Sequence, residues 1–486
     1  MACSSEPPPE TGTPQVTSTT PAPNPCVVTQ SEVVPSVFFV DPPELKGAHY
    51  VEYGQDNLFD RRTPNGEGPV AVLGLKAGDT YQVRSVTDTP DGPLTSCDAV
   101  EVVVPYPPPE LIRFTVSVPV DAARSELTGG FVLTSLIQEE TSWIVMMDQD
   151  GDYVWWYPVP ENAVAVTSLP SVDGAAFLWG EYDREKAADI GVVRRISLDG
   201  TEEQVTRTYL GHHGFIEHDD GTLGWLALAF SEVDANPAPD STDLQLLASD
   251  RILEAPLGHT DDKGFTEQFN MFDESGMTVW LECGHQQADF DRYGYFDIHE
   301  WTHTNSLTYL PEQDAYFVYS KYTDSLLKIE RSTKPGGRAT VAWQMSGLEG
   351  DFTAPDGSEL WRDTERSSLW SHGHLSHVWD GGFVLFDNQD HGDPEVSRIV
   401  EYSYDEETMT VEPVFIWPDP DGDHTPMMGD VRKLPGGNYL AGWSSLGRIN
   451  EIDPDTGDKV WEIQGDLGVV AGRIYPIPDP YNTSAW

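Results

Sequence analysis

The most regular feature of the chain is an apolar run that recurs after a turn rich in glycine or acidic residues. Six such runs lie between about residues 111 and 486: GGFVLTSL, DGAAFLWG, DGTLGWLALAF, EQDAYFVYS, GGFVLF and GGNYLAGW. Short apolar runs bounded by turns and rich in aromatic and β-branched residues are typical of buried strands. Because helical periodicity is scarce, the pattern predicts an all-β region built from six repeats.

Most of these runs are followed by a second strand pattern and a turn into a third. Examples are IVMMDQDGDYVWWY at 144–157 and RINEIDPDTGDKVWEI at 448–463. Four-stranded units repeated six times predict a six-bladed β-propeller over residues 111–486. The segment GRIYPIPDPY near the end is placed to add the strand that closes the ring, since a closed ring leaves no free strand edge.

The first quarter of the chain has a different pattern. Residues 1–30 are rich in Pro, Thr and Ser and predict an extended tether. Residues 31–108 contain short alternating runs, such as SVFFV, HYVEY and TYQVRSV, between turn residues. They predict a small β-sandwich of the immunoglobulin or fibronectin type. The prolines of PYPPPE at 105–110 then predict a stiff linker.

Charge narrows the function. The 486 residues include 81 acidic side chains against 28 Lys and Arg, a formal net charge of −53. Nucleic-acid binding needs a basic face, so a nucleic acid is excluded as a partner. The acidity favours a halophilic or marine source, where salt screens self-repulsion, over a generally acidic extracellular protein. Apolar runs stay far below the roughly 18 residues of a transmembrane helix, so none is predicted.

The four cysteines bear on the compartment. Cys26 and Cys97 bracket the predicted sandwich and are expected to form a disulfide, which indicates an oxidising environment. The opening Met-Ala-Cys-Ser-Ser resembles the end of a bacterial lipoprotein signal, with Cys3 as the lipid-bearing residue. We therefore expect export to the periplasm or cell surface, with membrane anchoring through Cys3.

The histidines carry the candidate chemistry. Twelve of the 13 lie at or beyond position 212. His213 and His374 each lie eight residues before a glycine of their repeat turn, and His303 occupies the equivalent position in the fourth repeat. The same offset in the last repeat reaches Gly429. A lone histidine is most often a core or surface residue, but matching positions in three consecutive repeats predict convergence on the central channel of the ring.

Three segments resemble the bacterial aryl sulfotransferases that use aryl sulfates directly as donors. They are GHHGFIEHDDGT at 211–222, DIHEWTHTNSLTYLPEQDAYFVYSKYTDSLLKIE at 297–330 and SHGHLSHVWDGGFVLFDN at 371–388. The resemblance implies a cofactor-free ping-pong transfer of a sulfuryl group from an aryl sulfate to a phenol. It implies that His374 is transiently sulfated, that His213 and His303 are active-site histidines, and that His212, Asn305, His372 and Asn388 bind substrate.

Lys321 departs from that pattern, because it stands at the position of the family's arginine. An arginine holds a sulfuryl group with a planar fork, whereas a lysine offers a compact point charge. An altered donor is therefore an alternative. The transfer is also chemically reasonable for these residue types, since a neutral imidazole can attack sulfur and hold the group covalently. Either His213 or His303 would exchange the proton of the phenol.

A metal-dependent hydrolase or lyase is a second interpretation. His299 and His303, or His372 and His374, with Asp297 nearby, have spacings that suit a zinc site. Cys283 and His285 form a further alternate pair, although a lone buried thiol is the simpler interpretation. The segments 148–152 (DQDGD) and 419–423 (DPDGD) resemble parts of calcium loops but lack the terminal bidentate Glu, which favours structural turns.

A third interpretation is a non-catalytic propeller that binds ligands at the cell surface. In this case the tryptophans would line a ligand groove, although packing between blades is the ordinary role of propeller aromatics. The candidates are Trp155, Trp156, Trp370 and Trp443.

Overall fold

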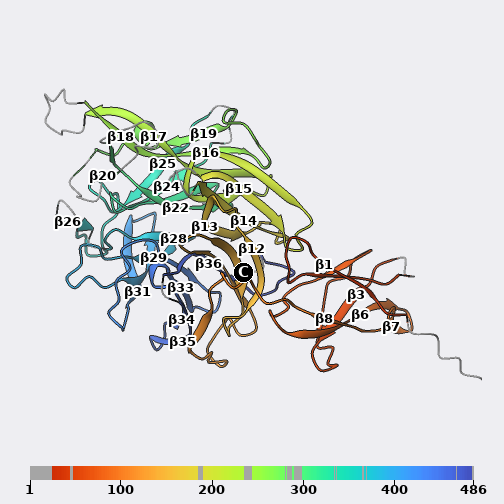
Figure 1. The fold of residues 1–486 in the computed structure, drawn as a ribbon. Coiled ribbons are helices and arrows are strands. Elements are labelled where there is room, and N and C mark those ends of the chain that lie inside the picture. Colours follow the sequence, from red (N-terminus) through yellow and green to blue (C-terminus); the bar gives the residue numbers. More distant parts are fainter. Residues whose placement is uncertain are drawn as a thin grey trace, which may run out of the picture.

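The computed structural model has two units, a β-sandwich and a ring of blades (Figure 1). It describes residues 24–43, 47–183, 190–234, 244–279, 281, 287–288, 298–332, 334, 337–363, 366–367, 369–466 and 468–483. Most of the predicted tether, with Cys3, lies outside the described residues, as do Cys283, His285 and Asp297. Among the described residues, no helix is long and apolar enough to cross a membrane.

The sandwich consists of two antiparallel sheets. One contains β1 (Val27–Gln30), β2 (Phe38–Asp41) and β5 (Val70–Val72). The other contains β4 (Arg61–Arg62), β3 (Tyr50–Gly54), β6 (Thr80–Thr89), β7 (Gly92–Thr95) and β8 (Val100–Val103). Strand β2 alternates buried and half-buried side chains, as expected for a strand with one face on a core.

The predicted disulfide is confirmed, and it corrects the start of the sandwich. Cys26 and Cys97 are bonded with their Cα atoms 5.0 Å apart. The backbone N–H of Cys26 also donates to the carbonyl of Asp98. These bonds hold the chain on the sheet, so β1 begins at Val27, inside the range 1–30 that we assigned to the tether.

Six blades follow, each with four antiparallel strands listed from the inside outward. The first blade comprises β36 (Val470–Ile477), β10 (Phe131–Ile137), β11 (Ser142–Met147) and β12 (Tyr153–Pro158). The second comprises β13 (Ala163–Pro170), β14 (Ala176–Asp183), β15 (Ile190–Ser197) and the first part of β16 (Glu203–Glu217). The third comprises the second part of β16, β17 (Thr222–Asp234), β18 (Leu244–Pro256) and β19 (Thr266–Asn270).

The fourth blade comprises β22 (Thr304–Leu310), β23 (Ala315–Ser320), β24 (Ser325–Glu330) and β25 (Thr340–Met345). The fifth comprises β28 (His374–Trp379), β29 (Gly382–Asp387), β30 (Arg398–Asp405) and β31 (Thr410–Pro418). The sixth comprises β32 (Asp430–Lys433), β33 (Tyr439–Trp443), β34 (Arg448–Asp453) and β35 (Asp458–Gly465). Strand β9 (Phe114–Val118) pairs with β35 as a fifth strand. Smaller elements are α1 (Met271–Glu274), β20 (Gln287–Ala288), β21 (Ile298–Glu300), β26 (Trp361–Asp363), β27 (Arg366–Ser367) and the 3-10 turn Ser444–Leu446.

The closing strand has the predicted role. Strand β36 pairs with β10, for example Phe131 opposite Ile477 and Leu133 opposite Tyr475. The inner strands then contact each other in the order β36, β13, β16, β22, β28, β32 and back to β36. The six apolar runs are the second strands of the blades, β10, β14, β17, β23, β29 and β33. The six-bladed propeller is therefore confirmed.

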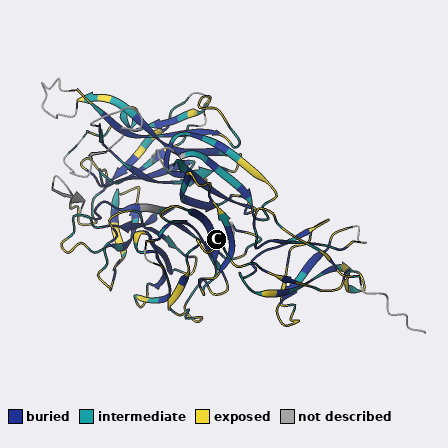
Figure 2. Ribbon diagram, viewed as in Figure 1, coloured by how far each residue is buried: buried dark blue, intermediate teal, exposed yellow. Residues whose placement is uncertain are grey.

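The tryptophans pack between blades and do not line a groove. Trp155, Trp156, Trp370 and Trp443 are all fully buried. The ring of Trp370 lies 5.6 Å from that of Phe383 and 5.7 Å from that of Tyr402, in edge-on contacts. Figure 2 shows the strands dark inside the ring, with exposed residues mainly at turns and edges. Of the two roles considered for these tryptophans, burial supports packing, the ordinary role of propeller aromatics, and contradicts the alternative of a ligand groove.

Basic side chains occupy both Asp-rich turns. The ammonium of Lys76, from the sandwich, lies 2.9, 2.8 and 3.0 Å from carboxylates of Asp148, Asp150 and Asp152 in the first blade. Among the described residues, these three aspartates are the group of His, Cys, Asp or Glu side chains whose potential metal-ligand atoms all lie within 4.8 Å of one another. At the second turn, Arg448 lies 2.9 Å from Asp419. The interpretation as structural turns is supported, since a cationic side chain already binds the carboxylates of each cluster.

The Lys76 contact is part of a broader interface between the units. A single hydrophobic cluster contains Val72 and Leu75 of the sandwich together with Leu127, Val132 and Trp156 of the propeller. The backbone N–H of Ala77 donates to the carbonyl of Tyr153 at 2.9 Å. The sandwich is thus fixed to the first blade by apolar packing, backbone hydrogen bonding and an ion cluster.

Lys76→Met should weaken this interface. Three carboxylates would lose their common cation, so we expect a loss of about 2 kcal/mol in the free energy of unfolding and a lower Tm. Thermal unfolding with and without EDTA tests this, and the chelator should not change the Tm of the wild-type protein. Lys263→Met removes an exposed lysine and serves as the control. An unchanged Tm in Lys76→Met would contradict the role of this contact.

Candidate active site

The structure brings His213, His303 and His374 together from three consecutive blades. His213 lies in the inner part of β16, His303 directly precedes β22, and His374 is the first residue of β28. The ring centroid of His213 is 4.8 Å from that of His303 and 5.9 Å from that of His374. The three rings therefore form one cluster where the inner strands begin.

The backbone at these strand starts is unusual. His213 and His303 have φ angles of 47° and 49°, in the left-handed region that histidine adopts more readily than most residues. The N–H of His213 donates to the hydroxyl of Tyr182, and its carbonyl accepts from the hydroxyl of Thr167. The carbonyl of His303 accepts from the N–H of Lys321 at 3.1 Å. Neighbouring strands thus hold a strained conformation at the site, as is common at functional positions.

His213 belongs to a buried chain of three ionisable side chains. Its Nδ1 lies 3.0 Å from Nδ1 of His212, and Nε2 of His212 lies 3.1 Å from Oδ1 of Asp250. His212 and Asp250 are both almost completely buried. The contact between His212 and Asp250 is an ion pair and not a well-aligned hydrogen bond. With the proton of His212 on Nε2, beside the carboxylate, Nδ1 of His212 accepts from His213. The chain therefore leaves Nε2 of His213 as an unprotonated base.

The carboxylate of Asp250 stays ionised in spite of its burial. Burial alone would raise its pKa, but the contact with His212 and hydrogen bonds from Thr302 and Thr304 outweigh this and hold the pKa below its usual value. The N–H of Thr304 donates to Oδ2 of Asp250 at 2.7 Å. Asp250 is thus a fixed negative charge behind the pair of histidines.

His303 has a simpler arrangement. Its Nδ1 lies 2.8 Å from Oε2 of Glu300, three residues earlier. Glu300 is buried. This contact places the proton of neutral His303 on Nδ1, which leaves its Nε2 as an acceptor. His213 and His303 are therefore both oriented by a carboxylate, directly in one case and through a second histidine in the other.

His374 is the histidine without such a carboxylate. It is 4% exposed, and its Nδ1 is buried with no hydrogen-bond partner among the described residues. Burial lowers its pKa well below the usual 6.5, the charges of Lys321, His303 and Arg473 act in the same direction, and a backbone contact with Gly429 opposes them only in part. His374 is therefore a neutral imidazole, which is the nucleophilic form.

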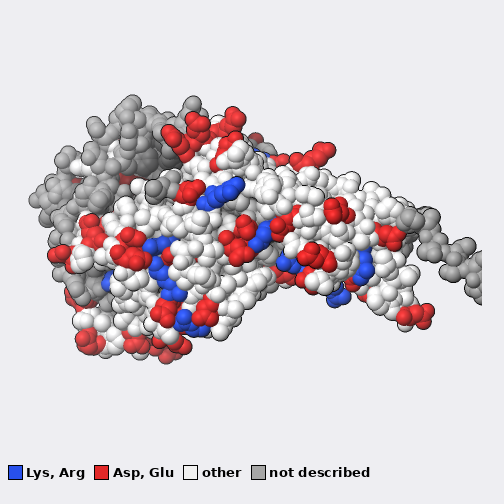
Figure 3. Space-filling view, turned by 60° about the horizontal axis from the view of Figure 1, so that its bottom comes forward, with Lys and Arg blue, Asp and Glu red and all other residues white. Residues whose placement is uncertain are grey.

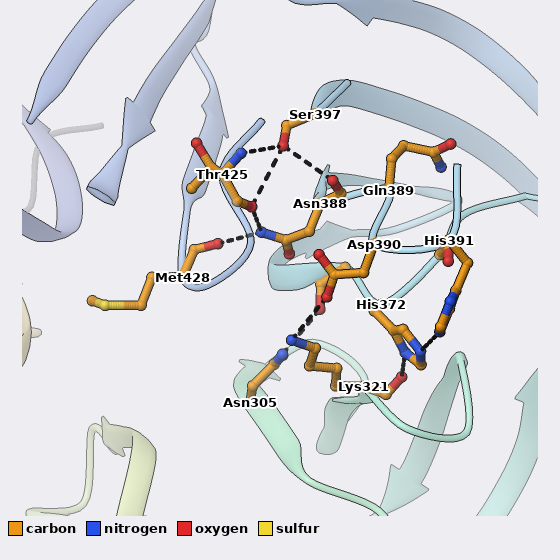
Figure 4. Close-up of polar contacts among 12 residues, drawn as sticks. Asn305, Lys321, His372, Asn388, Gln389, Asp390, His391, Ser397, Thr425 and Met428 are labelled. Carbon is orange, nitrogen blue, oxygen red and sulfur yellow. Dashed lines mark hydrogen bonds and ion pairs between the residues drawn. The ribbon is translucent and has the colours of Figure 1, made fainter. Parts of the chain in front are cut away.

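Lys321 is held in an ion network. Its Nζ lies 3.3 Å from Oδ2 of Asp390 (Figure 4). The other carboxylate oxygen of Asp390, Oδ1, lies 3.2 Å from Nε2 of His424. The charge of Lys321 still contributes to the low pKa of His374. Its ammonium is thus near the cluster but already shared with a carboxylate.

The other predicted substrate-binding residues hold the scaffold. Nδ1 of His372 donates to the carbonyl of Lys321 at 2.9 Å, and the amide of Asn305 donates to the carbonyl of Gly373 at 3.0 Å. The amide of Asn388 donates to the carbonyl of Met428 at 3.0 Å (Figure 4). Each contact joins neighbouring blades or loops. Direct substrate contacts of His372, Asn305 and Asn388, and of His212 behind His213, stay predictions.

Comparison with known proteins identifies the family. The profile of the family described as Arylsulfotransferase (ASST) matches residues 116–471, most of the chain and nearly all of the propeller. The chain belongs to the arylsulfotransferase family. It is therefore an enzyme of the transferase class, and membership supports aryl sulfotransferase activity with aryl sulfate and phenol substrates. No curated protein matches the chain.

Solved structures similar to this arylsulfotransferase are distant. A protein of unknown function from Bacteroides caccae is 14% identical, with 72% of this chain and 100% of that chain covered and a TM-score of 0.42. The periplasmic gluconolactonase of Pseudomonas aeruginosa is 9% identical, with 71% and 99% covered and a TM-score of 0.37. The virginiamycin B lyase of Staphylococcus aureus is 13% identical, with 73% and 88% covered and a TM-score of 0.32. These likenesses carry no argument about activity.

The histidine cluster also has neighbours that the sequence pattern did not predict. Asp250 is a single acidic residue in a chain with many, and no repeat position marked it. Arg473 lies on β36, the inner strand of the first blade, and its charge lowers the pKa of both His213 and His374. The predicted closing strand was a signal for Arg473, because a strand that closes the ring also lines its axis.

The arrangement does not favour the predicted metal pairs. Nδ1 of His303 faces Glu300, and His372 contacts the carbonyl of Lys321 and Nε2 of His391. Among the residues that the structure describes, the histidines of the arylsulfotransferase site are not part of a group of three or more close ligand atoms. Asp297, a member of the predicted set, lies outside those residues.

We expect the rings of His213 and His374 to stay neutral at pH values where an ordinary histidine becomes protonated. Burial is the largest cause of the lowered pKa for each, followed by His303 for His213 and by Lys321 for His374. Their ring signals in an NMR titration should show no protonation step near pH 6.5. A titration of either ring at this pH would contradict the description of the cluster.

Proposed function

We propose that the protein transfers a sulfuryl group from an aryl sulfate to a phenol by a ping-pong reaction through sulfated His374. The observation that carries this proposal is the buried, neutral His374 beside two histidines that are each oriented by a carboxylate. Such a set supplies one nucleophile and two groups able to hold or release a proton.

In the first half-reaction, the lone pair of Nε2 of His374 attacks the sulfur of the aryl sulfate. The new N–S bond forms as the bond between sulfur and the phenolic oxygen breaks, and the phenolate leaves with that electron pair. The negative charge of the bound donor favours the protonated form of one neighbouring histidine. This histidine takes up a proton from water as the donor binds, gives it to the phenolate and so releases the phenol. In the second half, the acceptor phenol gives its proton to the same base, its oxygen attacks sulfur, and the N–S bond breaks to restore neutral His374.

We assign the proton exchange to His213. When His213 takes up a proton at Nε2, its Nδ1–H still donates to His212, which is in turn held by ionised Asp250. The buried negative charge of Asp250 stabilises the positive charge that develops on the pair of histidines. His303 and Glu300 form the second carboxylate–histidine pair of the cluster, so a matched comparison of the two carboxylates tests the assignment.

We also propose that the protein is exported, with lipid anchoring through Cys3 and a saline habitat as further proposals. The Cys26–Cys97 disulfide supports export, because disulfides persist in oxidising compartments. The acidic composition supports the saline habitat. Figure 3 shows Asp and Glu side chains spread over both units on the visible face, with Lys and Arg between them.

His374→Ala should abolish transfer, because no other group replaces the attacking nitrogen. With a chromogenic aryl sulfate and no acceptor, mass spectrometry of the quenched wild-type protein should find one added sulfuryl group on His374. His377→Asn is the matched control, since His377 lies on the same strand and is half-buried, and the desolvation of its ring is the main cause that lowers its pKa to about 3. Full transfer by His374→Ala would rule out the mechanism.

Asp250→Asn should slow transfer from donors with poorly acidic phenols more than from donors with good leaving groups. General acid catalysis contributes about 10²–10⁴-fold, so we expect at least about a tenfold loss with the poorest leaving groups. The measurement is kcat/KM across a series of substituted phenyl sulfates. Glu300→Gln is the matched comparison, and a steeper leaving-group dependence in Glu300→Gln than in Asp250→Asn would assign the proton exchange to His303.

A further inference from the structure

Arg473 is a buried cation with no ion pair within 4.0 Å among the described residues. It is 4% exposed, and its Nε and Nη2 are buried with no hydrogen-bond partner among the described residues. These two nitrogens share one edge of the guanidinium and form the fork that binds two oxygens of an oxyanion side by side. A buried charge is strongly unfavourable unless it is paired, which indicates that the partner of Arg473 is a ligand.

The position of Arg473 near the axis follows from its strand, because β36 is the inner strand of the first blade and contacts the inner strands β13 and β32 on either side. Arg473 extends from the first blade, yet it affects Tyr182 on the second, His213 on the third, His374 and His377 on the fifth and Asp430 on the sixth. Its charge contributes to the low pKa of both His213 and His374, in agreement with a place on the inner strand near the histidine cluster.

The other cations near the cluster are already engaged. Lys321 lies 3.3 Å from Asp390. Nε of Arg432 donates to the carbonyl of Ile474 at 2.9 Å, and its guanidinium lies over the ring of Tyr475, 3.7 Å from the centroid. Of these cations, Arg473 is thus the one whose Nε and Nη2 have no hydrogen-bond partner among the described residues.

We propose that Arg473 is a further catalytic residue, whose Nε–H and Nη2–H bind two oxygens of the sulfuryl group in the aryl sulfate and in sulfated His374. The inference rests on the proposed function and explains how a lysine can stand at position 321. The planar grip that the family obtains from an arginine at that position comes here from the opposite side of the ring. The sulfuryl group then passes between His374 and a phenol while its charged oxygens stay on Arg473.

The test measures anion binding separately from transfer. Isothermal titration with inorganic sulfate, at an ionic strength kept constant with sodium chloride, is performed on the wild-type protein, Arg473→Gln and Arg473→Lys. Arg432→Gln is the matched control, because it removes a neighbouring guanidinium whose donors are engaged. Steady-state kcat/KM with a phenyl sulfate is measured on the same proteins, after circular dichroism shows that each is folded.

We expect Arg473→Gln to weaken sulfate binding at least tenfold and to lower kcat/KM by about 10²-fold or more, the usual effect of removing one oxyanion donor. Arg473→Lys, which keeps the charge but loses the fork, should bind sulfate with intermediate affinity and serves alone if the glutamine variant does not fold. Arg432→Gln should change sulfate affinity by less than about threefold, because its guanidinium already has partners.

The results separate this inference from the proposed function. If the wild-type protein transfers the sulfuryl group and Arg473→Gln keeps the same sulfate affinity and the same kcat/KM, the role of Arg473 is overturned and the proposed function stands. Sulfate binding that depends on Arg473, in a protein that transfers no sulfuryl group, would support the anion grip and overturn the function. Equal losses in Arg432→Gln and Arg473→Gln, or no sulfate binding by the wild-type protein, would also contradict the inference.

Discussion

The pairing of β36 with β10 is the contact on which the site depends. It joins residues 470–477 to residues 131–137 and turns six separate sheets into a closed ring with no free inner edge. Closure fixes the distances between inner strands, so His213, His303 and His374 meet although they are far apart in sequence. It also carries Arg473 to the axis. Without this pairing, the first blade would lose its inner strand, and the cluster would lose its unpaired cation.

The repeat pattern determined how much of the fold and site could be predicted. The six apolar runs became the second strands of the blades because turn glycines and buried alternation are local signals. The same alignment located the three histidines, since equivalent positions in a ring converge. Asp250 and Lys76 escaped prediction because their importance comes from partners in other strands or in the other unit. The buried tryptophans show that large aromatic residues alone do not distinguish packing from a ligand groove.

The charge distribution resolves an apparent conflict between a chain of net charge −53 and an anionic substrate. Many carboxylates lie on the surface, and others are neutralised in pairs, such as those around Lys76 and Arg448. The axis instead brings Arg473 close to the neutral rings of His213 and His374, and Lys321 close to that of His374. A local positive field inside an acidic shell can hold a sulfuryl group, while salt screens the longer-range repulsion of the surface.

A covalent intermediate on one histidine is the central claim, and burst kinetics test it most directly. Rapid mixing of the protein with a chromogenic aryl sulfate, in the absence of any phenol acceptor, should release about one equivalent of phenol per active site and then nearly stop. Addition of an acceptor should restart the release. Continuous release without an acceptor and without a burst, or no release until the acceptor is present, would contradict transfer through sulfated His374.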